Sequence, residues 1–365
     1  MIKQISIIGL GLIGGSIGLA VKKNNPQIKV IGIDVKTDNL NLAIKRNAID
    51  QGTTDLKTGV IESDIVFLAT PINTMYEIAK LISPFLKKQA IVTDVGSCKV
   101  EVTNNLEKIL PTTCNFVGGH PMAGSEQAGM AHADPYLFQN AVYVLTPTEK
   151  TNPKAVKDLS DLLKSIGANV IEMVPSRHDL IVAAVSHLPH LLAVNLVNSV
   201  GEYAEKDDLT LMLAAGGFRD TTRIAMGNED IWSDIFISNV GMILQVLQTF
   251  NINLAKLESF ISQKNDYEIK KIISKARRTR QEIPLKPKGL LPKLYELTLK
   301  VPDEPGIIAK IAKILSDEQI NIIDIEILRV REGEEGAIRI GLKEEDDFDA
   351  AFKLLEKNNF EVKRR

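Results

Sequence analysis

Three glycines near the start of the chain place the strongest constraint on its fold. They follow the apolar run 2–8 and open a helical pattern over residues 17–23. Gly9 permits a tight turn, Gly11 lets the backbone approach a pyrophosphate, and Gly14 allows the helix to pack closely on the strand. The free N–H groups at the start of such a helix favour an anion. The pattern therefore predicts a strand–turn–helix unit that binds phosphate.

A carboxylate at the end of the next strand indicates which dinucleotide this unit binds. Asp34 closes the apolar run 30–33 and lies 20 residues after Gly14. At that place a carboxylate accepts hydrogen bonds from the adenosine ribose and repels a 2′-phosphate. We therefore expect NAD to be preferred over NADP, although Lys36 supplies an opposing charge nearby.

Further strand patterns extend this unit into a larger sheet. Apolar runs at 64–70 and 90–94 each end in a turn, and runs at 141–147 and 169–174 follow. Strands that alternate with helices form a right-handed parallel sheet with its ligand at the carboxyl edge. The sequence thus predicts an α/β domain with a Rossmann-type doubly wound parallel sheet over residues 1–174. The expected cofactor-binding residues are Gly9, Gly11, Leu12, Ile13, Gly14, Asp34, Thr70, Pro71 and Ser97.

A histidine stands in the glycine-rich segment 118–126, which follows another short strand pattern, 115–117. His120 lies between Gly119 and Pro121. An imidazole at the carboxyl edge of the sheet titrates near neutral pH, which suits a general base. For a lone histidine, a turn residue bonded to backbone is the more common alternative. The cofactor site before this loop and a cationic site after it favour the catalytic interpretation.

The chain then changes to helical patterns, which we expect to form an all-α domain over residues 175–285. Its first helix is expected to begin at Ser176 as N-cap, with Asp179 three residues on, as in a capping box. Farther along that helix His187 and His190 share a face. A metal pair is the less favoured alternative, because no carboxylate or cysteine nearby completes a site. We expect the two rings to line a polar pocket and no metal to be bound.

Two arginines follow paired glycines in the segment 214–223. Arg219 and Arg223 are four residues apart and fall on one helical face. Guanidinium groups suit bidentate binding of carboxylates. A surface pair neutralised by Asp220 or Glu229 is an equally good interpretation of this segment alone.

Apolar residues recur with helical period from Ile231 over about 30 residues. Such a helix extends roughly 45 Å, too far for one small domain to cover. We therefore expect an intertwined homodimer of long helices. The apolar stretch 180–197 contains histidines and a proline, so we expect a buried helix and not a membrane span. The basic stretch 270–288 lacks aromatic residues for stacking, so we expect a solvated helix end and linker, not a nucleic-acid site.

Composition and charge set few further limits. The 365 residues suffice for two or three domains. A net charge of −2 gives no argument for nucleic acid or an acidic membrane as partner. Two cysteines make no disulfide framework and suit a reducing compartment. With no signal-peptide pattern at the N-terminus, we expect the protein to be cytoplasmic.

The last segment, 293–365, has its own alternation of patterns. Strands are expected at 294–301, 322–330, 336–342 and 360–363, with helices over 307–315 and 348–357. The order βαββαβ is that of a ferredoxin-like fold. The segment contains no histidine and no convergent catalytic set. We therefore expect it to bind or sense a ligand.

Six short motifs in order along the chain carry a family resemblance. They are GLGLIGGS at 9–16, DVGS with a lysine at 94–99, GGHPMAGSE at 118–126, SHLPH at 186–190, GGFRDTTR at 216–223 and VPDEPG at 301–306. The first five together resemble those of prephenate dehydrogenases. The sixth resembles the start of an ACT domain, a module that binds amino acids in metabolic enzymes. The resemblance covers essentially the whole chain.

This resemblance implies an activity, namely NAD-dependent oxidative decarboxylation of prephenate to 4-hydroxyphenylpyruvate and CO2 in tyrosine biosynthesis. It implies that His120 removes the hydroxyl proton and that Ser97 orients its ring. Arg223 is then expected to bind the ring carboxylate, with Arg219 secondary, while His187 and His190 line the pocket. The alternatives are arogenate, whose side chain carries an ammonium group in place of the keto group, and a nucleotide-sensing regulator without turnover.

The resemblance also implies a regulatory role for residues 293–365, with tyrosine as the effector. A helix N-terminus after the turn 303–306 can hold the carboxylate of an amino acid. Asp303 or Asn321 is then placed to meet its ammonium group. The expected contacts with the regulatory ligand are Asp303, Pro305, Gly306 and Asn321.

Overall fold

The computed structural model describes residues 2–124, 127–283, 295–302, 304–328 and 336–364. The chain divides into two compact units, Met1–Gly289 and Leu290–Arg365. The two domains expected within the first 285 residues thus form one compact unit. Their division at residue 174 stays a prediction.

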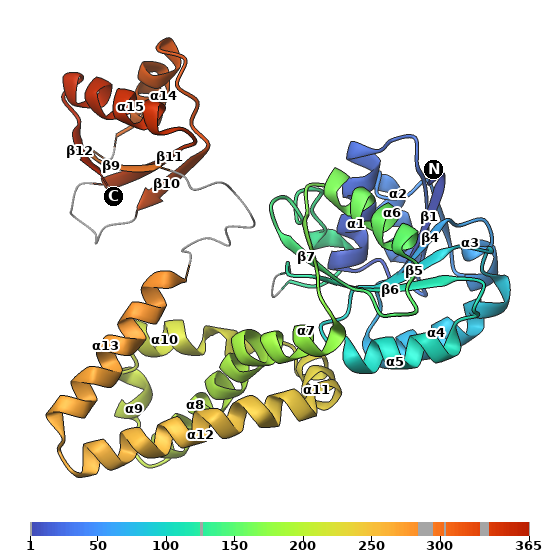
Figure 1. Ribbon diagram of the computed structural model, residues 1–365, viewed down its shortest axis with the longest axis horizontal. Coiled ribbons are helices and arrows are strands. Elements are labelled where there is room, and N and C mark those ends of the chain that lie inside the picture. Colours follow the sequence, from blue (N-terminus) through green and yellow to red (C-terminus); the bar gives the residue numbers. More distant parts are fainter. Residues whose placement is uncertain (1, 125–126, 284–294, 303, 329–335, 365) are drawn as a thin grey trace. The chain divides into compact units, whose positions relative to one another are not determined.

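An eight-stranded sheet forms the first half of the larger unit (Figure 1). Its strand order is β3-β2-β1-β4-β5-β6-β7-β8, and neighbours are parallel except at β6–β7. The chain winds outward from β1 in both directions, so the expected doubly wound α/β fold is confirmed. The strands are β1 (Gln4–Ile8), β2 (Lys29–Ile33), β3 (Gln51–Thr53), β4 (Ile65–Leu68), β5 (Ile91–Asp94), β6 (Asn115–Pro121), β7 (Val142–Thr146) and β8 (Asn169–Glu172).

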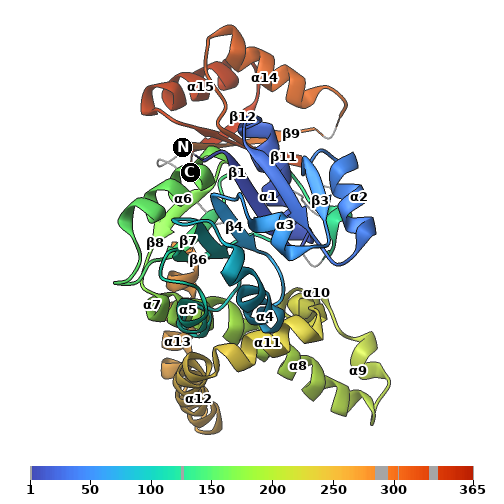
Figure 2. The ribbon, with the colours of Figure 1, turned by 90° about the vertical axis from the view of Figure 1, so that its right-hand side faces the viewer.

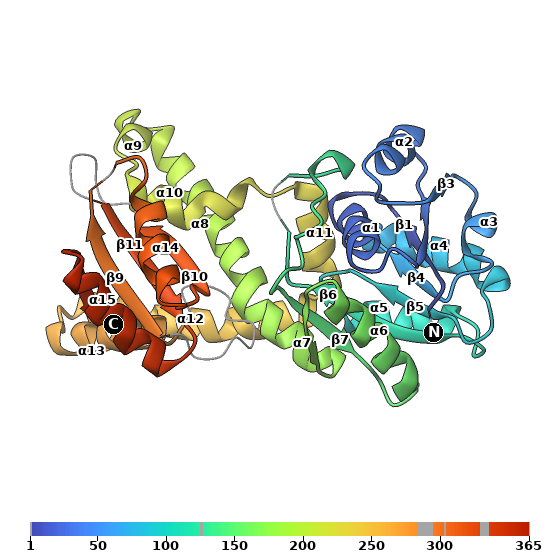
Figure 3. The same cartoon turned by 90° about the horizontal axis from the view of Figure 1, so that it is seen from above.

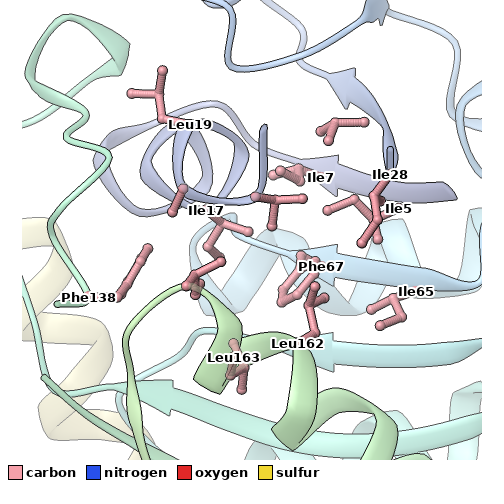
Figure 4. Packing of buried hydrophobic residues seen from close by; sticks show 14 of the residues in the cluster. Ile5, Ile7, Ile17, Leu19, Ile28, Ile65, Phe67, Phe138, Leu162 and Leu163 are labelled. Atoms are coloured by element: carbon pink, nitrogen blue, oxygen red, sulfur yellow. The ribbon is translucent and has the colours of Figure 1, made fainter. Parts of the chain in front are cut away.

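Helices cover both faces of this sheet and bury two separate cores. One core packs α1 and α6 on the strands, as Figure 4 shows for Ile17 and Leu163 beside Phe67. The other packs α4 and α5 on the face nearer the helical half (Figure 2). The helices are α1 (Leu12–Asn24), α2 (Thr37–Lys45), α3 (Leu56–Val60), α4 (Ile72–Ile82), α5 (Val100–Ile109) and α6 (Pro153–Ser165).

Strand β6 continues through the segment that we expected to be a loop. It pairs with β5 as far as Val117 and then with β7, where His120 lies opposite Val144. The loop prediction for His120 was therefore wrong. Glycine permits the continued strand, because a Cβ at Gly119 would lie 2.6 Å from the carbonyl oxygen of Asp94. His120 is consequently held by strand pairing at the carboxyl edge of the sheet.

A buried ion pair lies behind this strand. Lys99 and Asp94 are fully buried, and the ammonium group donates a hydrogen bond to the carboxylate. Lys99 Nζ also donates to the carbonyl of Gly119 at 2.6 Å, while the other oxygen of Asp94 accepts from the Gly119 N–H at 3.1 Å. Breaking such a pair by removing one partner costs ~3–5 kcal/mol, because a buried charge is left uncompensated. The pair therefore holds β6 to β5 next to His120.

The second half of the larger unit is helical (Figure 3). Its first rod runs from α7 through a π-helical turn, η3, into α8. Pro189 at the start of α8 has no N–H for the carbonyl four residues earlier, which accounts for the wider turn. The elements are α7 (Pro175–Val182), η3 (Ala183–His187), α8 (Leu188–Ala204), α9 (Leu209–Met212), α10 (Gly216–Thr222), η4 (Arg223–Met226), α11 (Glu229–Ser238), α12 (Val240–Ser262) and α13 (Asp266–Glu282).

The single long helix expected from Ile231 onward is wrong. The apolar period is carried by two helices, α11 and α12, which meet at 88°. Asn239 stands at the corner and is 4% exposed, because its side chain turns inward to bond other groups. Within α12, Ile243 is the one buried residue, while Leu244 and Leu254 are more than half exposed. The apolar stripe is thus left open by a single chain.

The rod 175–204 is also long and apolar enough, by length and composition, to cross a bilayer. Its mean hydropathy reaches 1.9 over its most apolar stretch. However, it carries His178, Asp179, His187 and His190, all buried against other parts of the unit. These contacts are typical of a core helix.

The smaller unit is a four-stranded antiparallel sheet with two helices (Figure 1). Its strand order is β10-β11-β9-β12, and Leu299, Ile311, Ile340 and Leu355 belong to its core. The expected βαββαβ order is confirmed. The elements are β9 (Tyr295–Val301), α14 (Ile307–Asp317), β10 (Asp324–Leu328), β11 (Gly336–Leu342), α15 (Glu345–Lys357) and β12 (Glu361–Arg364).

Candidate active site

Two histidines and an aspartate form a hydrogen-bonded chain at the carboxyl end of β6. His120 Nδ1 lies 2.8 Å from His178 Nε2, and His178 Nδ1 lies 2.7 Å from Asp179 Oδ1. His178 and Asp179 are each 1% exposed, whereas His120 at the strand end is partly exposed. The chain therefore runs from the surface of the site into the protein.

Asp179 joins the helical half to the sheet half. Its Oδ1 accepts the N–H of Lys99 at 2.7 Å, and its Oδ2 accepts the N–H of Val100 at 2.8 Å. These are N–H groups at the start of α5, where negative charge is stabilised. The capping box expected at Ser176 is wrong, because Val174 is the N-cap of α7 and Asp179 caps α5 instead. A local sequence pattern was mistaken for a long-range contact.

The hydrogen-bond chain fixes which ring nitrogens carry protons. The Asp179 carboxylate only accepts, so His178 Nδ1 must donate to it. A neutral His178 then has its lone pair on Nε2, and His120 Nδ1 must donate to that atom. His120 is left with a lone pair on Nε2, the form required of a general base.

The surroundings of His120 keep it uncharged. Burial lowers its pKa well below the usual value of 6.5, and the nearby His178, Lys99 and His187 lower it further. When Nε2 takes up a proton, Nδ1–H remains bonded to His178, which in turn is held by Asp179. The chain thus stabilises the imidazolium at the moment it forms, as in the aspartate–histidine pairs of other enzymes.

The orienting partner expected for His120 was Ser97, and the structure gives that contact to His178 instead. Ser97 is partly buried between β5 and α5 and makes no hydrogen bond to His120 among the described residues. Its expected role in cofactor binding stays a prediction. Next to it, Cys98 is fully buried, and burial raises the pKa of its thiol to about 12. This confirms the expectation of a structural, unreactive cysteine.

His187 lies in the same cluster, at the end of the π-helical turn. It is 1% exposed, and its Nδ1 lies 3.2 Å from Asn239 Nδ2. Burial lowers its pKa to about 4; Asp179 raises it in part, while His178 and His190 lower it further.

His190, one turn along α8, has a different environment. Its ring stacks on Trp232 with centroids 3.5 Å apart and planes at 15°. Gly227 closes the other side, since a Cβ there would lie 3.0 Å from His190 Nε2. Burial lowers the pKa of His190, and a backbone contact with Ile224 opposes this shift. Its contact with Trp232 therefore supports a packed wall better than an open polar surface.

The two arginines lie outside this histidine cluster. Helix α10 carries Arg219 in its last turn and ends at Thr222, and Arg223 begins the 3-10 turn η4. Both side chains are exposed. The turn that carries Arg223 packs against α8, the helix of His190. The roles expected for Arg223 and Arg219 stay predictions.

The glycine loop at the end of β1 has the geometry of a dinucleotide site. Gly9 has a φ of +94°, and a Cβ at Gly14 would lie 2.0 Å from the carbonyl oxygen of Gly9. A Cβ at Gly11 would meet no atom within 4 Å, so space remains there for a phosphate. Helix α1 begins after Gly11 without a side-chain cap, which leaves its first N–H groups for an anion. The residues present therefore fit a dinucleotide.

Asp34 stands beside this loop as expected. Its Oδ2 accepts the N–H of Leu10 at 2.8 Å and its Oδ1 that of Lys36 at 2.8 Å. Asn39 Nδ2 also approaches Oδ2, at 3.2 Å, a contact not foreseen from the sequence. Across the loop, the buried hydroxyl of Thr70 has no hydrogen-bond partner in the described part of the chain, as suits a group that faces a ligand.

Among the residues that the structure describes, no three His, Cys, Asp or Glu side chains are grouped so as to hold a metal ion.

Comparison with known proteins agrees with this geometry. Family models match in sequence order: the nucleotide-binding domain of prephenate dehydrogenase at residues 17–172, its dimerization domain at 174–275, and the ACT domain at 295–359. A prephenate dehydrogenase of Bacillus subtilis is 38% identical over 353 residues, covering 96% of this chain and 95% of that protein. The chain belongs to the prephenate dehydrogenase family.

Solved structures of the family support the same assignment. A prephenate dehydrogenase of Aquifex aeolicus in complex with hydroxyphenyl propionate and NAD+ superposes with a TM-score of 0.73 and 32% identity, covering 78% of this chain and 99% of that one. A Synechocystis arogenate dehydrogenase gives 0.69 and 31%, covering 76% and 99%. The expected family, Rossmann-type domain and ACT domain are confirmed, and NAD is supported as the cofactor of this prephenate dehydrogenase family member.

Replacing Asp179 with Asn tests the hydrogen-bond chain. The amide offers one oxygen in place of two carboxylate oxygens and cannot stabilise an imidazolium as an anion does. We expect kcat to fall by ~10²–10⁴, as for His120→Asn, while KM changes by much less. Steady-state kinetics measure both, with thermal melting as a check on folding. A folded Asp179→Asn enzyme with an unchanged kcat would contradict the assigned chain.

Proposed function

We infer that this chain catalyses the NAD-dependent oxidative decarboxylation of prephenate to 4-hydroxyphenylpyruvate and CO2. The observation that carries this inference is the neutral His120, whose Nε2 lone pair is fixed by His178 and Asp179 at the carboxyl edge of a dinucleotide-binding sheet. A reaction that oxidises a ring alcohol to a carbonyl needs a base of this kind. A nucleotide sensor without turnover has no use for one.

The bond changes assign a task to His120. The cofactor, when bound by the glycine loop and Asp34, accepts hydride from the ring carbon that bears the hydroxyl group. His120 Nε2 takes the hydroxyl proton as the carbonyl forms. The ring carboxylate leaves as CO2, and its bonding electrons complete the aromatic ring of 4-hydroxyphenylpyruvate. Aromatisation drives this loss, so the protein need not supply a decarboxylating acid.

The substrate is a dianion, which calls for cationic or hydrogen-bond-donating groups near His120. We propose that Arg223 binds the ring carboxylate through its bidentate guanidinium group, with Arg219 in a secondary role. His187 supplies a ring edge in the buried cluster. Leu12, Ile13, Thr70, Pro71 and Ser97 are the proposed cofactor contacts beside the three glycines.

Prephenate is favoured over arogenate as the substrate. The Bacillus subtilis prephenate dehydrogenase matches almost the entire chain, including its ACT domain, whereas the Synechocystis arogenate dehydrogenase structure covers 76% of it. We further propose that the protein works in the cytoplasm as a homodimer. The long apolar stripe of α12 and the dimerization-domain match support the dimer.

The test of this function is NADH formation, followed by its absorbance, when prephenate or arogenate is added with NAD. We expect kcat/KM for prephenate to exceed that for arogenate by at least ~10-fold, since a buried polar contact set for one substrate rejects an analogue that cannot form it. NADP should serve less well than NAD, because Asp34 repels a 2′-phosphate. Equal or faster turnover of arogenate would overturn the substrate assignment.

We propose that the ACT domain is a tyrosine-responsive brake. Gly306, with a φ of +94°, is the N-cap of α14 and brings no capping side chain, so the first N–H groups of that helix are available to a carboxylate. Pro305 and Asn321 are exposed nearby in sequence, whereas Asp303 lies outside the described residues. The expected contacts with tyrosine remain proposals.

Truncation before the ACT domain tests the brake. The chain ended at Gly289 retains the whole larger unit, so we expect it to keep most of its activity and to lose inhibition by tyrosine. Initial rates with and without tyrosine, measured for both forms, decide the matter. Full-length enzyme that ignores tyrosine, or truncated enzyme that stays inhibited, would place the brake or its effector elsewhere.

A further inference from the structure

The side chain at the corner between α11 and α12 contacts both branches of the active-site cluster. Asn239 Nδ2 lies 2.9 Å from the backbone carbonyl oxygen of Asp179 and 3.2 Å from His187 Nδ1. Asn239 is 4% exposed, so water does not offer it alternative partners. Its two contacts must therefore be explained by its own donors and acceptor.

The orientation of the Asn239 amide is settled by the carbonyl of Asp179. A backbone carbonyl only accepts hydrogen bonds, so the amide nitrogen, and not its oxygen, must face it. The opposite orientation would bring two acceptor oxygens together. The same nitrogen has a second hydrogen, and it is directed at His187 Nδ1.

This orientation fixes the proton of His187. Because Asn239 Nδ2 donates, His187 Nδ1 must be the acceptor, and the ring proton must be on Nε2. Nε2 has no hydrogen-bond partner among the described residues. The charged and titratable groups around the ring are Asp179, His178 and His190, and burial in this setting keeps the imidazole neutral near pH 7.

We propose that Asn239 is a positioning residue that makes His187 a neutral N–H donor, through Nε2, to an oxygen of the substrate. Two neighbouring imidazoles thereby receive opposite tasks from one aspartate. The Asp179 carboxylate, through His178, leaves a lone pair on His120 Nε2. The Asp179 carbonyl, through Asn239, leaves a proton on His187 Nε2.

The division of tasks has a chemical reason. A donor that carried a full charge would disfavour protonation of His120, which must become an imidazolium during the reaction. A neutral donor binds the substrate oxygen without that penalty. The proposal rests on the proposed function for the identity of the substrate, but the position of the proton on His187 does not depend on it.

The first measurement is nitrogen NMR of the full-length protein labelled in its five histidines, with the His187 signal assigned by its loss in His187→Gln. We expect one proton on His187, at Nε2, at neutral pH. A proton on Nδ1, or a doubly protonated ring, would overturn the proposal. This readout needs no substrate, so it separates failure of the proposal from failure of the proposed function, which would show as no NADH from prephenate.

The second measurement reverses the donor at the corner. In Asn239→Asp the carboxylate can only accept, so the His187 proton should move to Nδ1, and kcat/KM for prephenate should fall ~10–100-fold, mainly through KM. The matched control is Asn265→Asp, since Asn265 is the N-cap of α13 and an aspartate can cap that helix equally well. The control should leave both quantities unchanged. A folded Asn239→Asp enzyme with an unmoved proton and unchanged KM would contradict the proposal.

A third pair of variants decides the matter if Asn239→Asp does not fold. The His187→Gln side chain keeps a neutral N–H donor near the position of Nε2, whereas His187→Glu supplies only an acceptor at neutral pH. We expect His187→Gln to keep kcat/KM within ~10-fold of wild type and His187→Glu to lose ~10-fold more. Equal losses in the two variants would show that the site needs only the volume of His187 and would overturn the proposal.

Discussion

The carboxylate of Asp179 is the interaction on which the rest of the site depends. It is buried, and it is satisfied by three donors: two N–H groups at the start of α5 and the ring of His178. A buried charge without such partners would cost several kcal/mol. One side chain of the helical half is thereby locked to the sheet half, and the geometry of the base is fixed by the same bonds that join the two halves.

A second buried charge positions the other member of the chain. The Lys99–Asp94 pair binds both the N–H and the carbonyl of Gly119, the residue before His120. The strand and the helix that carry the two histidines are thus each anchored by a fully bonded charge. Lys99 also supplies one of the N–H groups that hold Asp179, so a single turn between β5 and α5 serves both anchors.

The sequence was sufficient for what depends on local pattern and insufficient for what depends on distant contacts. The glycine loop, Asp34 and the βαββαβ order each follow from short-range periodicity and turn chemistry, and all were predicted. His178 and Asp179 appeared to belong to a helix start, because nothing in their neighbours reveals the open N-terminus of α5. The corner at Asn239 was hidden by an apolar period that continues through it, and its cause is a bond to a carbonyl 60 residues away.

The account rests on an uncharged His120 whose pKa is lowered mainly by burial and further by His178, Lys99 and His187. The pH dependence of kcat/KM for prephenate tests this most directly, because it reports the ionisation of the free enzyme. A lowered pKa keeps the base unprotonated to lower pH, so activity should be retained below pH 6.5 and lost only as the pH falls through the lower value. An acid limb centred at or above 6.5, assigned to His120 by its absence in His120→Asn, would contradict the account.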